Sequence, residues 1–422
     1  MPIYALCDAN NFYVSAERIF RPDLEGKPCI VLSNNDGCAV ARSVEVKALG
    51  VKMGVPRFQI EDLIYEHGIV TMSSNYTLYS DISARFMTTL ESLAPEIFVY
   101  SIDEAFLNLT GMEQTYNLET YGRLIKETVQ QHVGIPICVG ISTTKTLSKL
   151  ANHGAKKYQA TGGVVDLTDP ERQRRLMKLV EVGDVWGVGR KISKKLIDMG
   201  IESALDLADA DPKWIRQHFS VVLERTQREL NGVACIPFDD NPAHQKQIVV
   251  SRSFGARITE LSDMRTAVAT FLTKAMEKLR KGHQKTALLQ VFIRTSPFSK
   301  HEPQYSNALT YRFPAPISDT RLALNAAMQL LKTMWKQGYL YAKAGVMLTD
   351  FYPETVEQHS LFDSTMDKAE SQALMDVMDQ INHSGIGKVT LATQANRANW
   401  AMKRENLSPC YTTRWSDLPR VK

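Results

Sequence analysis

The segment YSIDEAF at residues 100–106 places two adjacent acids, Asp103 and Glu104, within an apolar run. Successive residues of a strand point to opposite faces of a sheet, and a buried carboxylate is costly unless a base or a metal ion compensates its charge. Apolar residues flank the acids on both sides, in VYSIDEAFLNLTG at residues 99–111, in place of the Gly or Asn of a tight turn. The pattern predicts that the acids lie at a break between two strands of a hairpin.

A third acid, Asp8, follows the apolar residues 3–7, which are predicted to form a strand. If the three strands are neighbours, Asp8, Asp103 and Glu104 converge at one edge of a sheet, where their repulsion calls for a cation. Mg²⁺ prefers such oxygen ligands and binds substrate phosphates beside one or two carboxylates, and two such ions serve phosphoryl transfer. A pair of exposed surface acids is the alternative interpretation of Asp103 and Glu104 taken alone.

The order of elements around these acids indicates an α+β protein. We expect a helix that Asn10 or Asn11 can cap, a strand at residues 29–32, and a small insertion of helix and loop up to residue 75. The next predicted elements are helices at 79–94 and 116–132 and strands at 97–102, 105–109 and 136–141. This order predicts an antiparallel or mixed sheet covered by helices.

The sequence pattern of the second half of the chain predicts a helical region, a linker and a further α+β module. Residues 171–232 have a helical pattern, and IPFDDNPAHQ at 236–245 has the two prolines and the irregularity of a linker. Beyond the linker, the pattern predicts strands at 247–253, 287–294 and 342–348 and helices at 261–281 and 319–337. The order strand–helix–strand–strand–helix–strand is that of a split βαβ sandwich.

Length and composition bound the class of protein. A chain of 422 residues should hold roughly two to four domains, and 44% hydrophobic with 23% charged residues is ordinary for a globular protein. We expect no signal peptide and no membrane span, and the six scattered cysteines, without a C-x-x-C pair, predict reduced thiols in the cytoplasm.

Positive charge is concentrated between residues 241 and 350. This segment has sixteen Lys and Arg residues against six Asp and Glu residues, a net charge of +10 in a chain whose total is +4. A basic module beside a more acidic remainder indicates nucleic-acid contact. The alternative is a solvated surface with a chance excess of basic residues.

Four motifs carry a resemblance to a known family. They are CDANNFYVSAE at 7–17, SNNDGCAVARS at 33–43, YSIDEAFLNLTG at 100–111 and GISTTKTLSKLANHGAKK at 140–157. In content, order and spacing they resemble the Y-family of translesion DNA polymerases, and the resemblance extends to the C-terminus. It implies an error-prone polymerase that adds dNTPs to a primer opposite damaged template DNA in the SOS response.

The resemblance implies a right-hand architecture with a ferredoxin-like palm, small fingers, a helical thumb and a split βαβ little finger. The implied boundaries are palm 1–30 and 75–165, fingers 31–74, thumb 166–238, linker 239–245, little finger 246–350 and tail 351–422. It also implies two Mg²⁺ ions, with Mn²⁺ as a substitute. Their ligands would be Asp8, Asp103, Glu104 and the carbonyl of Ala9.

Other residues near the acids match family positions. Tyr13 matches the steric gate that excludes a ribose 2′-OH, with a core aromatic as the alternative. Arg42, Lys47 and Lys156 match positions for the incoming triphosphate, where cations oppose phosphate charge. Val44 departs from the family pattern, which often has an aromatic residue there.

Two regions are candidates for DNA contact. The GVG motif, with Gly187 and Gly189, resembles a helix-hairpin-helix whose backbone N–H groups approach a phosphate, and a tight αα turn is the alternative. Basic residues follow in the next helix and in the basic segment: they are Lys191, Lys194, Lys195, Arg252 and Arg257.

The segment QHSLF at 358–362 resembles the peptide by which bacterial proteins dock on the sliding clamp, through Gln358, Leu361 and Phe362. His359 stands where Leu is common, and an apolar anchor of the tail is the alternative. The resemblance further implies primer–template DNA, dNTPs, a UmuD′-like accessory dimer and a RecA-type recombinase as partners. It implies no membrane partner, and a location in the bacterial cytoplasm at the nucleoid.

Two competing functions use the same features. A sheet with paired acids and two metals also serves nucleotide cyclisation or phosphodiester hydrolysis, against which the gate position, the hairpin and the basic module argue. A non-catalytic DNA scaffold derived from a polymerase is the other, against which the intact acids argue. Primer extension with metal and dNTPs separates all three.

Overall fold

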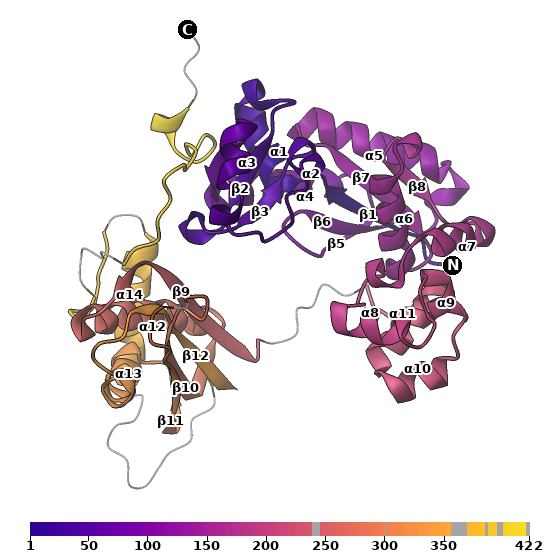
Figure 1. Cartoon of the computed structure of the whole chain (residues 1–422). Helices are drawn as coiled ribbons and strands as arrows, with labels where there is room; N and C mark the ends of the chain where they lie inside the picture. The colour runs from indigo at the N-terminus through magenta and orange to yellow at the C-terminus, as the bar shows by residue number, and fades with distance from the viewer. Residues whose placement is uncertain (239–244, 300, 356–368, 385–386, 395–399, 419–422) are drawn as a thin grey trace. The chain divides into compact units, whose positions relative to one another are not determined.

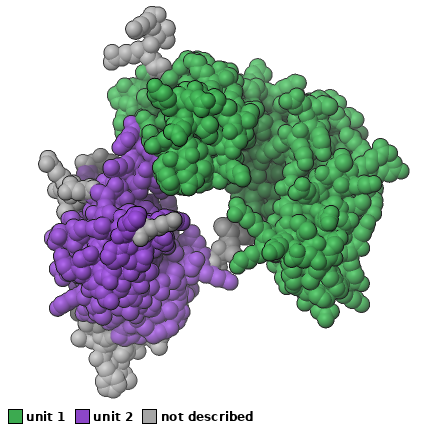
Figure 2. Space-filling view, viewed as in Figure 1, with its two compact units in different colours: residues 1–33, 37–241, 406–422 green, residues 34–36, 242–405 purple. Residues whose placement is uncertain are grey.

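The structure is a computed structural model that describes residues 1–238, 245–299, 301–355, 369–384, 387–394 and 400–418 (Figure 1). The chain divides into two compact units (Figure 2). Unit 1 comprises residues 1–33, 37–241 and 406–422, and unit 2 comprises residues 34–36 and 242–405. No helix of the described residues is long and apolar enough to cross a membrane, and all six cysteines, each in a described region, carry free thiols.

A five-stranded sheet forms the centre of unit 1. Its order is β5 (Glu96–Val99), β6 (Glu104–Asn108), β1 (Tyr4–Ala9), β7 (Ile137–Ser142) and β8 (Val164–Asp166). The β1 strand is antiparallel to both of its neighbours, whereas β7 and β8 are parallel. The mixed sheet expected from the sequence is therefore present, and every residue of β1 is buried.

Helices cover both faces of this sheet. One face packs against α1 (Phe12–Phe20), α4 (Tyr76–Glu91) and α5 (Leu118–Val133) in a single apolar core. The other face carries α6 (Lys145–Lys157), which lies close to β7 because Gly140 has no side chain. A Cβ atom at Gly140 would lie 2.2 Å from the backbone nitrogen of Asn152, so this close approach requires glycine.

Two local details differ from the sequence-based prediction. Asp8 lies at the C-terminal end of β1 as predicted, but the strand extends one residue further to Ala9, and the partner of Asp8 in the register is Glu104. Asn11 precedes α1 in a left-handed conformation with φ of 50°, and its side chain makes no capping hydrogen bond. The Asn11 carboxamide instead accepts a hydrogen bond from Lys47.

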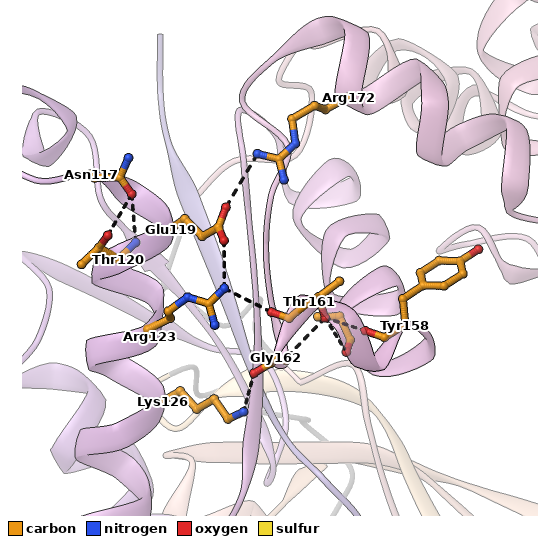
Figure 3. A network of polar contacts seen from close by, with 11 residues as sticks. Asn117, Glu119, Thr120, Arg123, Lys126, Tyr158, Thr161, Gly162 and Arg172 are labelled. Carbon is orange, nitrogen blue, oxygen red and sulfur yellow. Dashed lines mark hydrogen bonds and ion pairs between the residues drawn. The ribbon is translucent and has the colours of Figure 1, made fainter.

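A polar network fixes the turn that follows α6 (Figure 3). From α5, Arg123 donates to the carbonyl of Thr161 over 3.4 Å and pairs with Glu119 at 2.9 Å. Lys126 donates to the carbonyl of Gly162 over 2.5 Å. These contacts tie the turn after α6, a helix that carries Lys156 in its last turn, to α5.

A second, three-stranded sheet of unit 1 has the order β3 (Ala39–Arg42), β2 (Cys29–Leu32) and β4 (Val70–Ser73). It has its own small apolar core with α2 (Val44–Ala48) and α3 (Glu61–Glu66) nearby. The sequence indicated helix and loop for this insertion, and it missed β3 and β4 because each is only four residues long.

Five helices follow the large sheet and share a core with α6. They are α7 (Pro170–Leu179), α8 (Arg190–Ile197), α9 (Ala204–Asp209), α10 (Pro212–His218) and α11 (Val221–Leu230). Glu229, which is fully buried, joins α11 to α6 by accepting hydrogen bonds from the backbone and hydroxyl of Thr146.

Unit 2 is built on a four-stranded antiparallel sheet. Its order is β11 (Ser306–Ile317), β10 (Gln284–Thr295), β12 (Tyr341–Pro353) and β9 (Gln247–Ile258). The long helices α12 (Leu261–Lys281) and α13 (Thr320–Met334) share its apolar core. The element order predicted from the sequence is confirmed, although the strands are longer than expected and β11 had no predicted range.

A further helix, α14 (Ala369–His383), joins unit 2 through a partly buried ion pair. Arg280 of α12 is 9% exposed and donates to both carboxylate oxygens of Asp379, over 2.7 and 2.8 Å. A fragment that ended at residue 350 would lose this carboxylate and leave the guanidinium buried beside neutral acceptors alone.

Candidate active site

Two of the three predicted acids meet across neighbouring strands. Asp8 of β1 lies opposite Glu104, the first residue of β6, and the backbone N–H of Ala9 donates to the carbonyl of Asp103 over 2.9 Å. Burial, followed by the hydrogen bond with Glu104, raises the pKa of Asp8 to about 7. Burial also acts on Glu104, but the bond with Asp8 and the charge of Lys149 lower its pKa. Burial therefore favours the protonated form of Asp8, whereas the neighbours of Glu104 favour its charged form.

Two lysines of α6 neutralise this pair. The Lys156 Nζ atom lies 2.5 Å from Asp8 Oδ1, and the Lys149 Nζ atom lies 3.0 Å from Glu104 Oε2. Asp8 itself is only 7% exposed. Lysine side chains thus compensate both carboxylates, whereas the sequence pattern predicted metal ions in this role.

The third acid is oriented differently. Asp103 Oδ1 accepts a hydrogen bond from the Ser101 hydroxyl over 2.6 Å. In the part of the chain that the structure describes, no group of three His, Cys, Asp or Glu side chains is assembled as a metal site. The donor set nevertheless fits a hard divalent cation, because Asp8 and Glu104 offer adjacent carboxylate oxygens. Burial makes the negative charge of these carboxylates costly, and a bound cation would compensate it.

Tyr13 packs against two other tyrosines. Its ring stacks on Tyr79 with centroids 4.3 Å apart and meets the edge of Tyr76 at 6.2 Å. Burial, then Tyr76 and Asp103, raise the pKa of the Tyr13 phenol. The ring is only partly buried against the core, so part of it remains accessible to solvent.

The three basic residues matched to the triphosphate lie near one another. Burial, then the charges of Arg42 and Lys156, lower the pKa of Lys47. Arg42 also donates to the carbonyl of Val51 over 2.6 Å. Val44 is 65% exposed. This concentration of positive charge beside Asp8 suits an anionic ligand.

The sequence analysis missed Lys145 and Lys149. Both lie on α6 with Lys156, and the spacings of four and seven residues place all three on one helix face. Lys145 is 1% exposed, lies 3.9 Å from the centre of the Phe98 ring, and donates to the carbonyl of Pro237 over 2.8 Å. The helical spacing of lysines in GISTTKTLSKLANHGAKK was the available signal.

The GVG motif forms the turn before α8. Gly187 has φ of +90°, which disfavours other residues, and Gly189 is the N-cap of α8. Lys191, Lys194 and Lys195 are exposed on this helix, although Lys195 also donates to the carbonyl of His218 over 2.6 Å.

In unit 2, basic side chains line a groove of about 380 Å³, here called the basic groove. Its charged lining residues are Arg252, Lys274, Glu277, Lys278, Lys281 and His383. Burial, then the charge of Arg252, lowers the pKa of Lys274. Arg257 is not among the lining residues, and its charge is paired, because its Nε atom lies 3.4 Å from Glu302 Oε2.

The clamp-like residues Gln358, Leu361 and Phe362 lie outside the described residues.

Family models match most of the chain. The impB/mucB/samB family matches residues 7–153, and the C-terminal domain of that family matches residues 245–361. A domain of unknown function, DUF4113, matches residues 372–421.

Curated relatives match the whole length. The chain is 50% identical over 422 residues to protein UmuC of Salmonella typhimurium, which covers 100% of both chains. It is 47% identical over 417 residues to protein MucB of Escherichia coli, with 99% of each chain covered. DNA polymerase IV of Moorella thermoacetica is 27% identical over 387 residues, which are 90% of this chain and 92% of that protein.

Among solved structures, a Y-family DNA polymerase chimera of Dbh and Dpo4 is similar with a TM-score of 0.66. The match covers 83% of this chain and 99% of the chimera at 19% identity. At this identity, the likeness shows a shared fold.

Proposed function

Because this chain belongs to the impB/mucB/samB family of Y-family DNA polymerases, we propose that Asp8, Asp103 and Glu104 form its nucleotidyl-transfer site. The chain is an error-prone translesion DNA polymerase, which is a DNA-directed DNA polymerase. The observation that best supports the site is the opposition of Asp8 and Glu104 on adjacent strands, with the pKa of Asp8 raised by burial. We propose that the enzyme acts in the SOS response.

The carboxylates of Asp8, Asp103 and Glu104, with the Ala9 carbonyl, would hold two Mg²⁺ ions, for which Mn²⁺ could substitute. When bound, such ions stabilise the attacking and leaving oxygens of phosphoryl transfer. The protein's part is to supply charged oxygens on rigid strands in a site where burial strengthens each electrostatic contact.

The surrounding side chains would orient the nucleotide. Arg42, Lys47 and Lys156 would bind the triphosphate of the incoming dNTP, since their mutual repulsion favours an anion between them. Tyr13 would pack beneath the sugar and exclude a 2′-OH. No side chain of the site is assigned as general base, because positioning and charge stabilisation account for most phosphoryl-transfer catalysis.

Primer extension by the full chain, with a defined primer–template, dNTPs and Mg²⁺, tests this proposal. A polymerase extends the primer one templated nucleotide at a time. A phosphodiesterase would shorten the DNA, a cyclase would convert the nucleotide without extending the primer, and a scaffold would bind DNA without any turnover. The last three outcomes contradict the proposal.

Lys149 is expected to position Glu104. Replacing Lys149 with Ala should lower the rate of nucleotide insertion about 10- to 100-fold, because a partly buried carboxylate loses the partner that orients it. Single-turnover insertion rates measure the effect. Lys157→Ala, an exposed lysine on the same helix, is the matched control and should retain the wild-type rate. Equal rates for both variants would show that Glu104 needs no support from Lys149.

Unit 2 is proposed to bind the DNA backbone without sequence preference. We expect its affinity for duplex DNA to fall steeply with salt, with a slope of roughly −0.9 in log K against log salt for each neutralised phosphate. The isolated segment should comprise residues 242–405, so that Asp379 stays with Arg280.

Arg252→Ala should reduce that slope by roughly 0.9, because Arg252 lines the basic groove. Lys332→Ala, on the exposed side of α13, is the control that should leave the slope unchanged. A flat salt dependence of the wild-type segment would mean that these charges do not face DNA.

The segment QHSLF at 358–362 is proposed to dock on the sliding clamp. Joint replacement of Gln358, Leu361 and Phe362 with Ala should shorten clamp-dependent products, because a tethered polymerase stays at high effective concentration near the primer end. Insertion on a short primer without clamp should be unchanged. Equal product lengths for wild type and variant would contradict this proposal and favour the alternative, in which the segment is an apolar anchor of the tail.

The remaining partners are proposed from the family. They are primer–template DNA, dNTPs, a UmuD′-like accessory dimer and a RecA-type recombinase. The DNA substrate would place the enzyme at the nucleoid in the bacterial cytoplasm.

A further inference from the structure

The C-terminal segment Asn406–Tyr411 returns to unit 1 and packs beside β4 and α1. It pairs with the edge of β4: the Ser73 N–H donates to the carbonyl of Asn406 over 2.9 Å, and the Asn406 N–H donates to the Ser73 hydroxyl over 3.0 Å. Tyr411 is buried and stacks on Phe20 of α1, with ring centroids 4.7 Å apart. This segment lies in the domain of unknown function.

Ser408 connects this segment to a buried carboxylate. The Ser408 hydroxyl donates to Glu17 Oε1 over 2.9 Å, and the Tyr79 hydroxyl donates to the same oxygen over 2.7 Å. Glu17 is 0% exposed, and burial raises its pKa while the two hydroxyls lower it. A buried carboxylate depends strongly on each hydrogen bond that it accepts.

The same carboxylate is connected to the Tyr13 ring through Tyr79. Glu17 follows Tyr13 by four residues on α1, so both side chains lie on one face of the helix. Tyr79, whose hydroxyl bonds to Glu17, is fully buried and provides the ring on which Tyr13 stacks at 4.3 Å. Ser408, Glu17, Tyr79 and Tyr13 therefore form one continuous chain of contacts.

A second set of contacts links the C-terminal segment to the N-terminus of α4. The Asn75 side chain caps this helix by accepting from the Leu78 N–H over 3.2 Å. Its amide group also donates to the carbonyls of Ser408 and Pro409, over 3.0 and 3.2 Å. The C-terminal segment thereby fixes the first turn of the helix that carries Tyr79.

We propose that the segment Asn406–Tyr411 is a positioning element for the Tyr13 ring and sets how strictly the enzyme excludes ribonucleotides. The inference rests on the proposed function, since it needs Tyr13 as the gate. A ring excludes a 2′-OH only if it cannot move aside, and Tyr13 is held on one side by Tyr79. If the Tyr79 side chain becomes more mobile, the Tyr13 ring can move aside although it is still present.

The test uses the full-length chain and compares single-nucleotide insertion of an rNTP with that of the matching dNTP. Ser408→Ala should raise the rNTP to dNTP insertion ratio about three- to tenfold, the factor that one lost hydrogen bond corresponds to. Insertion of dNTPs should stay within about twofold of wild type. Ser408→Thr, which retains a hydroxyl, should restore the ratio.

Tyr79→Phe removes the other donor to Glu17 and should raise the ratio similarly, which also provides a test if Ser408→Ala fails to fold. Because both act through Glu17, the double variant should show less than the product of the single effects. Ser416→Ala is the matched control: this serine lies five residues after the segment, is exposed, and donates to Asp417 over 3.0 Å.

An unchanged ratio in both Ser408→Ala and Tyr79→Phe, with normal dNTP insertion, would overturn the inference and leave the segment as a structural strap. A rise that Ser416→Ala shares would overturn it too. Failure of the wild-type chain to insert any nucleotide would instead overturn the proposed function. The two failures are therefore distinguishable.

Discussion

Replacing Glu104 with Ala should lower the rate of nucleotide insertion by about a thousandfold or more. Metal-assisted stabilisation of phosphoryl transfer is worth several kcal/mol, and each 1.36 kcal/mol is a factor of ten in rate. Asp103→Ala should have an effect of the same order, although its carboxylate bonds to Ser101 in the structure described here. Both variants should bind primer–template DNA with nearly wild-type affinity, because unit 2 supplies the proposed backbone contacts. Single-turnover insertion and fluorescence anisotropy measure the two properties.

A matched acid on the same sheet separates catalysis from stability. Glu96 of β5 is exposed and accepts a hydrogen bond from Asn108 over 2.9 Å, so Glu96→Ala should insert nucleotides at the wild-type rate. Glu104→Ala also leaves Lys149 without its partner, and thermal unfolding of the variant measures that cost. Extension of the primer at near the wild-type rate by Glu104→Ala would exclude this residue from the site.

The proximity of two of the acids was predictable from the sequence because strands impose a simple geometry. An apolar strand that ends near Asp8 and a hairpin broken at Asp103 and Glu104 leave few other arrangements in a sheet. The orientation of the side chains was not predictable, since it depends on Ser101 and on lysines from a helix some forty residues later. The spacing of residues along the sequence indicates on which face of a helix or strand each side chain lies, but not which residue of another element it contacts.

The contacts of the C-terminal segment could not be predicted for a related reason. Residues after 363 carry only a weak periodic pattern, so the sequence gives no partner for them. Their contacts span more than 300 residues of sequence, as between Asn75 and Ser408, and consist of backbone groups and short polar side chains. Such contacts leave no periodic pattern of apolar residues in the sequence, and that pattern is the main signal for prediction from one sequence.

Tyr13→Ala is expected to raise the ratio of rNTP to dNTP insertion by about a hundredfold or more. A 2′-OH forced against a fixed ring costs roughly 3 kcal/mol, and loss of that clash corresponds to about two orders of magnitude. The ring is well placed to resist movement, since it stacks on Tyr79 and meets Tyr76 edge-on. Single-nucleotide insertion of matched rNTP and dNTP pairs gives the ratio.

Two controls decide whether the ring itself is the barrier. Tyr13→Phe keeps the ring and removes only the hydroxyl, so its ratio should remain near that of the wild type if steric exclusion is the cause. Tyr65→Ala removes a tyrosine that is 93% exposed on α3 and should have no effect. If Tyr13→Ala leaves the ratio unchanged, Tyr13 is a packing residue of α1 and another side chain excludes the 2′-OH. A rise in Tyr13→Phe equal to that in Tyr13→Ala would assign the discrimination to the hydroxyl, whose pKa is raised by burial and by its neighbours Tyr76 and Asp103.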